Sequence, residues 1–367
     1  MSNIKTLKNA IILTMDKQDN YFMNGTIITE NNLIKEIGPT SDIEFKGDIY
    51  DFSDKLLMPG LINTHTHSVS PLFRSMADDM SLMDWLKKVI WPAEKKLTKE
   101  MAYYGAILSC LEFISSGITC FVDQYFFAEH ILKAVKHSKL RAFITPTVFS
   151  WPSPETNNVI VEVENYLDKH GVNPTSRIST GIGPHAPYSV NEKDWKKVMD
   201  IAEHYNLLIH THISETKDEN QEINKKYGLT PTEWLNKLGV LSYPVLAAHS
   251  IHLSAKDLDI YEANNVAVTY NPVSNLKLVS GIMPLKEMKN RNITISIGTD
   301  GAQSNNSLDL FRDLKTGVLI QKNHNQDAEF ISSNEALRIA TLDGAKAIGM
   351  EKEIGSLQPG KKADIIS

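Results

Sequence analysis

The sequence has few cysteines and no long apolar run, and each absence excludes a class of protein. Only Cys110 and Cys120 occur among 367 residues, both in apolar surroundings and without CxxC spacing. A disulfide framework is therefore excluded, and two buried free thiols in a reducing compartment are expected. No apolar run approaches the roughly 20 residues that cross a bilayer, and the N-terminus has no apolar leader core. We expect a cytoplasmic protein without a membrane partner.

Runs of basic residues are also missing. The 38 Lys and Arg residues are dispersed, and the formal net charge is −6. This pattern argues against nucleic acid or an anionic membrane as the main partner. A chain that is 42% hydrophobic and 22% charged can bury a large core, so a small molecule is the expected partner.

The first 58 residues have the pattern of a small β module. Short apolar or alternating segments lie at 7–15, 24–30, 33–38 and 49–52. Asn31 and Asn32 mark a turn between two of them, and Pro59 with Gly60 ends the module. Residues 351–367 become strand-like again at the other end of the chain.

From Leu61 onward, short apolar runs alternate with longer helical patterns. The apolar runs lie at 60–67, 118–125, 141–149, 177–188, 207–215, 244–252, 266–272 and 293–301. Eight strands separated by helices are what a closed parallel (β/α)₈ barrel requires. An open doubly wound sheet is the alternative, but no glycine-rich dinucleotide fingerprint follows the first run. We therefore predict an α/β fold with a TIM barrel over 59–350, ending in one helix over 332–350.

Polar residues stand at the ends of these runs, where a barrel places its active site. His65 and His67 point the same way, because side chains alternate along a strand, and they can bind one ion. Other runs end in or near further residues of the same kinds, namely His185, His212, Glu215, His249 and Asp300. A single buried histidine would be ordinary packing. Several imidazoles and a carboxylate at one end of a barrel indicate a site for zinc, iron or manganese.

Six motifs then carry a resemblance to a known family. PGLINTHTHS, GPHAPY, HISE, AAHSIHL, NPVSNLKL and GTDGAQSNNS resemble, in order and over essentially the whole chain, the amidohydrolase superfamily. The closest branch is that of the methylthioadenosine/S-adenosylhomocysteine deaminases and chlorohydrolases. The resemblance implies one divalent metal per chain, zinc first and iron, manganese or nickel as alternatives, with four ligands, His65, His67, His212 and Asp300. Members with two metals usually carry a modified lysine at the end of strand four, where GIGPHAPY has none.

The resemblance also implies a reaction. His249 would polarise a metal-activated water, Asp300 would orient it, and Glu215 would shuttle protons. The chain would then be a hydrolytic deaminase that converts the 6-amino group of an adenosine derivative to oxo and releases ammonia. The alternative for Glu215 is a solvated carboxylate at a helix start, because TKDEN follows it, and His249 could likewise be structural.

Substrate residues follow from the same resemblance. Trp85 would form an apolar wall, Glu94 would accept hydrogen bonds from ribose hydroxyls, His185 would contact a purine nitrogen, and Ser304 would lie nearby. The alternatives are helix core for Trp85 and a solvated helix face for Glu94. Pro146 stands where relatives that accept S-adenosylhomocysteine carry an arginine, and residues 150–165 offer none. Methylthioadenosine or adenosine is therefore favoured over S-adenosylhomocysteine.

Other readings stay open at this point. Another hydrolase of the superfamily would act on guanine, a triazine or another aminated or halogenated heterocycle, and a non-catalytic scaffold would have lost its ligands. His210 and His252 are expected to pack or to support the ligands. In relatives, segments like 1–58 and 351–367 form a small β-sandwich domain, which this chain would leave incomplete at Ser367. The branch also implies a homo-oligomer, a dimer or a tetramer.

Overall fold

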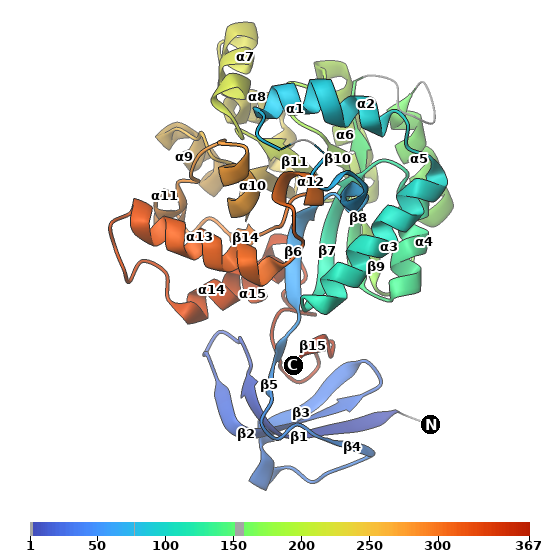
Figure 1. Ribbon diagram of the computed structural model, residues 1–367, viewed down its shortest axis with the longest axis vertical. Helices are drawn as coiled ribbons and strands as arrows, with labels where there is room; N and C mark the ends of the chain where they lie inside the picture. Colours follow the sequence, from blue (N-terminus) through green and yellow to red (C-terminus); the bar gives the residue numbers. More distant parts are fainter. Residues whose placement is uncertain (1–2, 77, 151–157) are drawn as a thin grey trace.

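The structure is a computed structural model that describes residues 3–76, 78–150 and 158–367. Its first part is a six-stranded sheet (Figure 1). The antiparallel strands are β1 (Ile4–Leu13), β2 (Tyr21–Glu30) and β3 (Leu33–Pro39), followed by η1 (Thr40–Asp42). Two strands run parallel to β1, namely β4 (Asp48–Asp51) and β5 (Leu56–Pro59). The last strand, β15 (Ile365–Ile366), pairs antiparallel with β5, so both ends of the described chain meet in this sheet.

The second part is built on parallel strands in two sheets. One sheet contains β6 (Leu61–Thr66), β7 (Ile118–Tyr125), β8 (Arg141–Val148), β9 (Ile178–Thr180) and β10 (Gly183–Pro184). The other contains β11 (Ile209–Ile213), β12 (Val245–His249), β13 (Ala267–Tyr270) and β14 (Ile295–Ile297). A parallel bridge joins Ile182 to Ile209, and Thr64 Oγ1 donates to the carbonyl of Ile297 at 2.9 Å. The two sheets therefore approach each other along both edges.

Helices connect these strands and surround them (Figure 1). Between β6 and β7 lie η2 (Ser70–Phe73), α1 (Leu82–Trp85), the π-helical η3 (Leu86–Ile90), α2 (Trp91–Glu94) and α3 (Lys99–Ser115). The following connections contain α4 (Ala128–Ser138), α5 (Val159–His170), α6 (Glu192–Tyr205), α7 (Lys217–Tyr227), α8 (Pro231–Leu238) and η4 (Val240–Ser242). The last group comprises α9 (Ala255–Ala263), α10 (Pro272–Lys277), α11 (Leu285–Asn290), α12 (Ala302–Asn305), α13 (Leu310–His324), α14 (Ser333–Ile339) and α15 (Leu342–Ala347).

Burial follows the strands. Every residue of β6, β11, β12 and β14 is buried, as is typical of parallel strands covered on both faces. Cys110 and Cys120 are free and buried, as their apolar surroundings predicted. Among the described residues, no helix combines the length and the apolarity that a bilayer crossing requires.

The predicted terminal helix over 332–350 is wrong in one respect, because the structure divides it into α14 and α15. Thr341, between them, has φ −130° and ψ −92°, which is not helical. The carbonyl of Ala340 accepts a hydrogen bond from the N–H of Ile62 on β6 instead of continuing the helix. Tertiary pairing with a strand thus overrides the local helical pattern.

Candidate active site and metal centre

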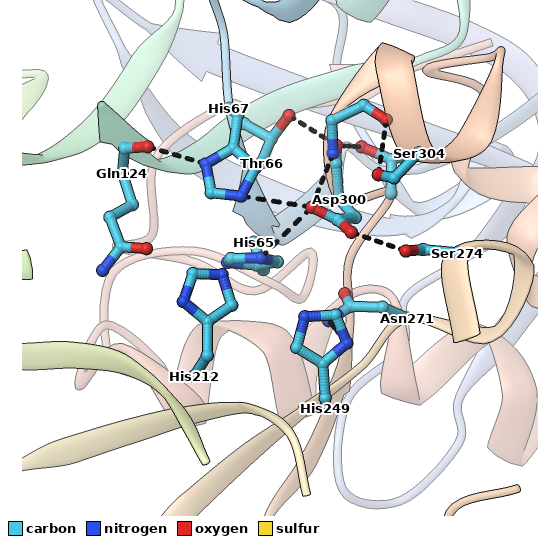
Figure 2. A network of polar contacts seen from close by, with 12 residues as sticks. His65, Thr66, His67, Gln124, His212, His249, Asn271, Ser274, Asp300 and Ser304 are labelled. Carbon is cyan, nitrogen blue, oxygen red and sulfur yellow. Dashed lines mark hydrogen bonds and ion pairs between the residues drawn. The ribbon is translucent and has the colours of Figure 1, made fainter. Parts of the chain in front are cut away.

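The carboxyl ends of β6, β11 and β12 and the loop after β14 carry polar residues that lie close together (Figure 2). Asp300 Oδ1 lies 3.5 Å from His65 Nε2 and 3.2 Å from His67 Nε2. The N–H of Asp300 donates to the carbonyl of His65 at 3.0 Å, which holds the loop after β14 against β6. Gly298 makes this approach feasible, since a Cβ there would lie 2.7 Å from the same carbonyl.

The histidine side chains of the site share one orientation, in which Nδ1 forms a hydrogen bond with the surrounding protein. His67 Nδ1 is 2.7 Å from the carbonyl of Gln124, and His212 Nδ1 is 2.6 Å from that of His185. A carbonyl only accepts, so each of these Nδ1 atoms carries a proton and leaves Nε2 to face the other groups of the site. His65 Nδ1 likewise contacts His210 Nε2 at 2.7 Å. This is the arrangement by which proteins fix metal-binding histidines.

A divalent cation fits this donor set. One ligand atom from each of His65, His67 and His212 can lie within 4.8 Å of the other two, and the same holds for His65, His249 and Asp300. The Nε2 atom of His65 is buried and has no hydrogen-bond partner among the described residues. A buried polar atom in that state is costly, and a cation at the centre of the set would satisfy it.

The surroundings of these groups shift their pKa values in different directions. Burial lowers the pKa of His65 to about 4 and, helped by neighbouring imidazoles, holds the pKa of His212 well below its usual value. Burial would lower the pKa of His67 too, but the hydrogen bond and charge of Asp300 outweigh it and raise that pKa to about 9. Burial raises the pKa of Asp300, yet the two imidazoles outweigh burial and depress it strongly. The His67 imidazole and the Asp300 carboxylate thus stabilise each other's charged forms.

Glu215 and His249 lie beside the cation-binding set. The Glu215 side chain is buried, its Oε2 lies 3.8 Å from His249 Nε2, and Oε1 accepts from Ser280 Oγ at 3.4 Å. Burial raises the pKa of Glu215 above its usual value, so this carboxyl group holds a proton more readily than an exposed one does. Glu215 is therefore not a solvated carboxylate at a helix start.

One segment, residues 271–280, contacts Asp300, His249 and Glu215 and contains α10. Ser274 Oγ donates to Asp300 Oδ2 at 2.6 Å, and Asn275 Oδ1 accepts from His249 Nδ1 at 2.8 Å. Ser280 contacts Glu215 as described above. The sequence motif NPVSNLKL marked this segment, but its pattern did not say which side chain serves which group.

A pocket opens next to these groups and contains the four expected substrate residues. Its wall includes Trp85, Glu94, Phe149, His185 and Ser304. Trp85 is 4% exposed, and Phe149 stacks on His185 with ring centroids 4.3 Å apart. Glu94 Oε1 accepts from Tyr125 Oη at 2.6 Å, and burial raises the Glu94 pKa to about 7, so Glu94 is not a solvated surface acid. Ser304 donates its hydroxyl to the carbonyl of Gly301.

Two histidines lie outside the cation-binding set, and some contacts were not foreseen. His210 contacts His65 and, through Nδ1, the carbonyl of Leu246 at 3.1 Å. His252 Nε2 lies 2.7 Å from the carbonyl of Ser280. Sequence reasoning missed Tyr125, although it ends an apolar run beside the other strand ends. Part of the segment expected to lack an arginine, residues 151–157, lies outside the described residues.

Comparison with known proteins gives consistent results. A model of the amidohydrolase family matches residues 56–367. A 5'-deoxyadenosine deaminase of Methanobrevibacter smithii is 40% identical over 366 residues, covering 99% of this chain and 83% of that protein. A 5-methylthioadenosine/S-adenosylhomocysteine deaminase of Caldanaerobacter subterraneus is 39% identical over 361 residues, covering 98% and 83%. A crystal structure of an adenosine deaminase from Xanthomonas campestris with bound zinc superposes with a TM-score of 0.94 at 31% identity, covering 98% and 83%.

Proposed function

This chain belongs to the amidohydrolase family, and we propose that it is a metal-dependent deaminase of adenosine derivatives. The family expected from the sequence motifs is thereby confirmed. The chain is a hydrolase acting on carbon–nitrogen bonds in cyclic amidines, as its deaminase relatives are. The observation that carries the proposal is the shared inward orientation of His65, His67 and His212 toward Asp300, with Glu215 beside them.

We propose that His65, His67, His212 and Asp300 hold one divalent cation. Zinc is preferred, because imidazole nitrogens and a carboxylate suit it and the Xanthomonas relative contains it. Such an ion supplies a water of lowered pKa as the nucleophile. Asp300 would orient that water, and His249, whose Nδ1 contacts Asn275 Oδ1, would polarise it.

Glu215 is the proton carrier in this proposal. Its raised pKa lets it accept the proton that the nucleophile loses and deliver a proton to the purine nitrogen next to the carbon under attack. The second proton of the attacking water would pass, again through Glu215, to the 6-amino group, which departs as ammonia as its bond to the ring carbon breaks and the carbon–oxygen bond becomes the 6-oxo group. His185 would contact another ring nitrogen, Trp85 would cover the base and Ser304 would lie beside it, as all three line the pocket.

The pocket supports a nucleoside with a small, uncharged 5' group. Among the described residues that line it, none is Lys or Arg, and Phe126 stacks with Phe149 at 5.5 Å on one side. An amino-acid carboxylate would find no cation there, whereas a methyl or methylthio group would bury apolar surface. We therefore propose 5'-deoxyadenosine, methylthioadenosine or adenosine as substrates in preference to S-adenosylhomocysteine.

The finer architecture is also a proposal. The two parallel sheets would close into a (β/α)₈ barrel over residues 59–350, because contacts join both pairs of edges. Residues 1–58 and 351–367 would form the small β-sandwich domain, since β15 pairs with β5. Free buried cysteines support a reducing compartment such as the cytoplasm. We propose a homo-oligomer, a dimer or a tetramer, because α3 carries exposed apolar residues.

The test is ammonia release by purified protein whose bound metal has been quantified. We expect about one ion per chain and rapid release from 5'-deoxyadenosine or methylthioadenosine, but slow release from S-adenosylhomocysteine and none from guanine. Glu215→Gln should keep the ion and lose about 10²- to 10⁴-fold in kcat, the usual contribution of proton transfer. Glu222→Gln, an exposed acid on α7, is the matched control. Normal turnover by Glu215→Gln would remove Glu215 from this role.

A further inference from the structure

Glu215 sits in a turn whose backbone needs support. The turn joins β11 to α7, and Ser214 within it has φ 53°, in the left-handed region that a serine rarely occupies. The carbonyl of Ser214 accepts the N–H groups of Ile251 at 3.0 Å and His252 at 2.9 Å. Strained conformations of this kind persist only where the surroundings hold them in place.

A second buried carboxylate, Glu219, completes that support. One oxygen of Glu219 accepts the backbone N–H of Ser214 at 3.0 Å, and the other accepts that of Glu215 at 2.8 Å. The Glu219 side chain is 4% exposed and is not among the residues that line the substrate pocket. Its carboxylate therefore holds the backbone of the turn through these two hydrogen bonds.

This arrangement departs from ordinary helix capping. Glu219 is the third residue of α7, and its N–H donates to the N-cap residue Thr216 at 3.2 Å. An acid at this position usually bonds back to the N-cap N–H, as Glu233 of α8 and Asp257 of α9 do here. Glu219 instead reaches past Thr216 to the two preceding N–H groups.

We propose that Glu219 is a positioning residue that fixes the main chain of Glu215 and so aims the Glu215 carboxyl at the reacting groups. The inference rests on the proposed deaminase function. Each Glu219 oxygen accepts a backbone N–H group. A glutamine side chain cannot replace this carboxylate, because its NH2 group only donates. Burial raises the pKa of Glu219, and the N–H groups of Glu215 and Ser214 oppose that rise by stabilising the carboxylate.

The first test is Glu219→Gln, with Glu222→Gln on the same helix as the control. We expect kcat to fall about 10- to 100-fold, a part of what proton transfer contributes, with KM within about twofold and the bound ion retained. The exposed Glu222→Gln should match the wild type. Glu219→Asp keeps two accepting oxygens and should recover part of the lost kcat. An unchanged kcat in Glu219→Gln would overturn the proposal. A fall in kcat accompanied by a comparable rise in KM and by loss of the bound ion would overturn it as well.

A double-mutant cycle with Glu215→Gln separates positioning from a general structural effect. If Glu219 acts through Glu215, adding Glu219→Gln to Glu215→Gln should cause no further loss of residual turnover. Losses that multiply would contradict the inference. Amide hydrogen exchange in the wild-type holoenzyme needs no variant: the N–H groups of Ser214 and Glu215 should be protected, and fast exchange would also overturn it. A wild type that deaminates none of the adenosine derivatives would instead refute the proposed function.

Discussion

At the scale of single residues, the site depends on which nitrogen of each imidazole carries the proton. His67 and His212 donate Nδ1–H to backbone carbonyls, so their orientation is tied to the strands themselves. His65 uses a side chain, His210, which in turn is held by the carbonyl of Leu246. Three Nε2 atoms are thereby held close together by the fold itself, which reduces the reorganisation that binding an ion requires.

Glu94 provides a prediction about pH. Burial raises its pKa to about 7 from an ordinary value near 4.5, so the carboxylate form is lost as the pH falls through about 7. Hydrogen bonds to a charged acceptor exceed those to a neutral one by about 1 kcal/mol, so KM for a ribonucleoside should rise about fivefold between pH 8 and pH 6. The measurement is KM against pH for adenosine and for 2',3'-dideoxyadenosine.

The dideoxy substrate is the control, because it lacks both hydroxyls that Glu94 would bind. Its KM should not show the step at pH 7, and Glu94→Gln should remove the step for adenosine. Effects of pH on Glu215 cancel in the comparison, since both substrates need the same proton transfer. Equal pH profiles for the two nucleosides would show that Glu94 does not recognise the ribose.

At the scale of elements, the sequence located strands and strand ends better than it located supporting contacts. The eight apolar runs contain the strands of the two parallel sheets in chain order, with β9 and β10 both inside the run at 177–188. Burial on both faces leaves a plain apolar pattern in such strands. Glu219 shows the limit. In the sequence it belongs to the polar stretch TKDEN, which suggested a solvated helix start. Its burial arises from a turn geometry that no periodicity encodes.

The segment Asn271–Ser280 provides a prediction at this scale. Its helix α10 ends in Lys277, whose Nζ contacts Asn306 Oδ1 at 2.8 Å and Asp78 Oδ1 at 2.6 Å. Lys277→Met would remove that anchor while keeping the apolar stem. We expect kcat to fall about tenfold, because Ser274 and Asn275 would hold Asp300 and His249 less firmly.

The control for that variant is Lys286→Met on the exposed face of α11, which should leave kcat unchanged. The kcat of both variants is measured by steady-state kinetics, and their melting temperatures are measured by thermal unfolding. A lower melting temperature with full kcat would show that α10 contributes stability without positioning the catalytic groups.

At the scale of the whole molecule, α3 has an apolar surface that the described part of the chain leaves exposed. Five exposed apolar residues follow one side of this helix, namely Met101, Tyr104, Leu108, Leu111 and Ile114. Together they span about 20 Å at 1.5 Å per residue. Glu112, the one acid in the second half of α3, is paired with Arg74. A continuous uncharged stripe of this kind marks a protein interface more often than a free surface.

The stripe is symmetric about its centre, which favours a second copy of the chain as the partner. Met101 precedes the midpoint by as many residues as Ile114 follows it, and Tyr104 and Leu111 are related in the same way. Two antiparallel copies of α3 across a two-fold axis would therefore place Met101 against Ile114 and Tyr104 against Leu111. Such a stripe can form the apolar centre of an interface of about 800 Å² per partner.

The prediction is that Leu108→Lys dissociates the assembly, because it places two ammonium groups at the axis in a desolvated contact. Sedimentation velocity should show a dimer or tetramer for the wild type and a monomer for the variant. Leu319→Lys, at an exposed leucine of α13, is the matched control and should sediment as the wild type does. A wild-type monomer at about 100 μM, well above the dissociation constants usual for homodimers, would show that α3 does not pair with itself.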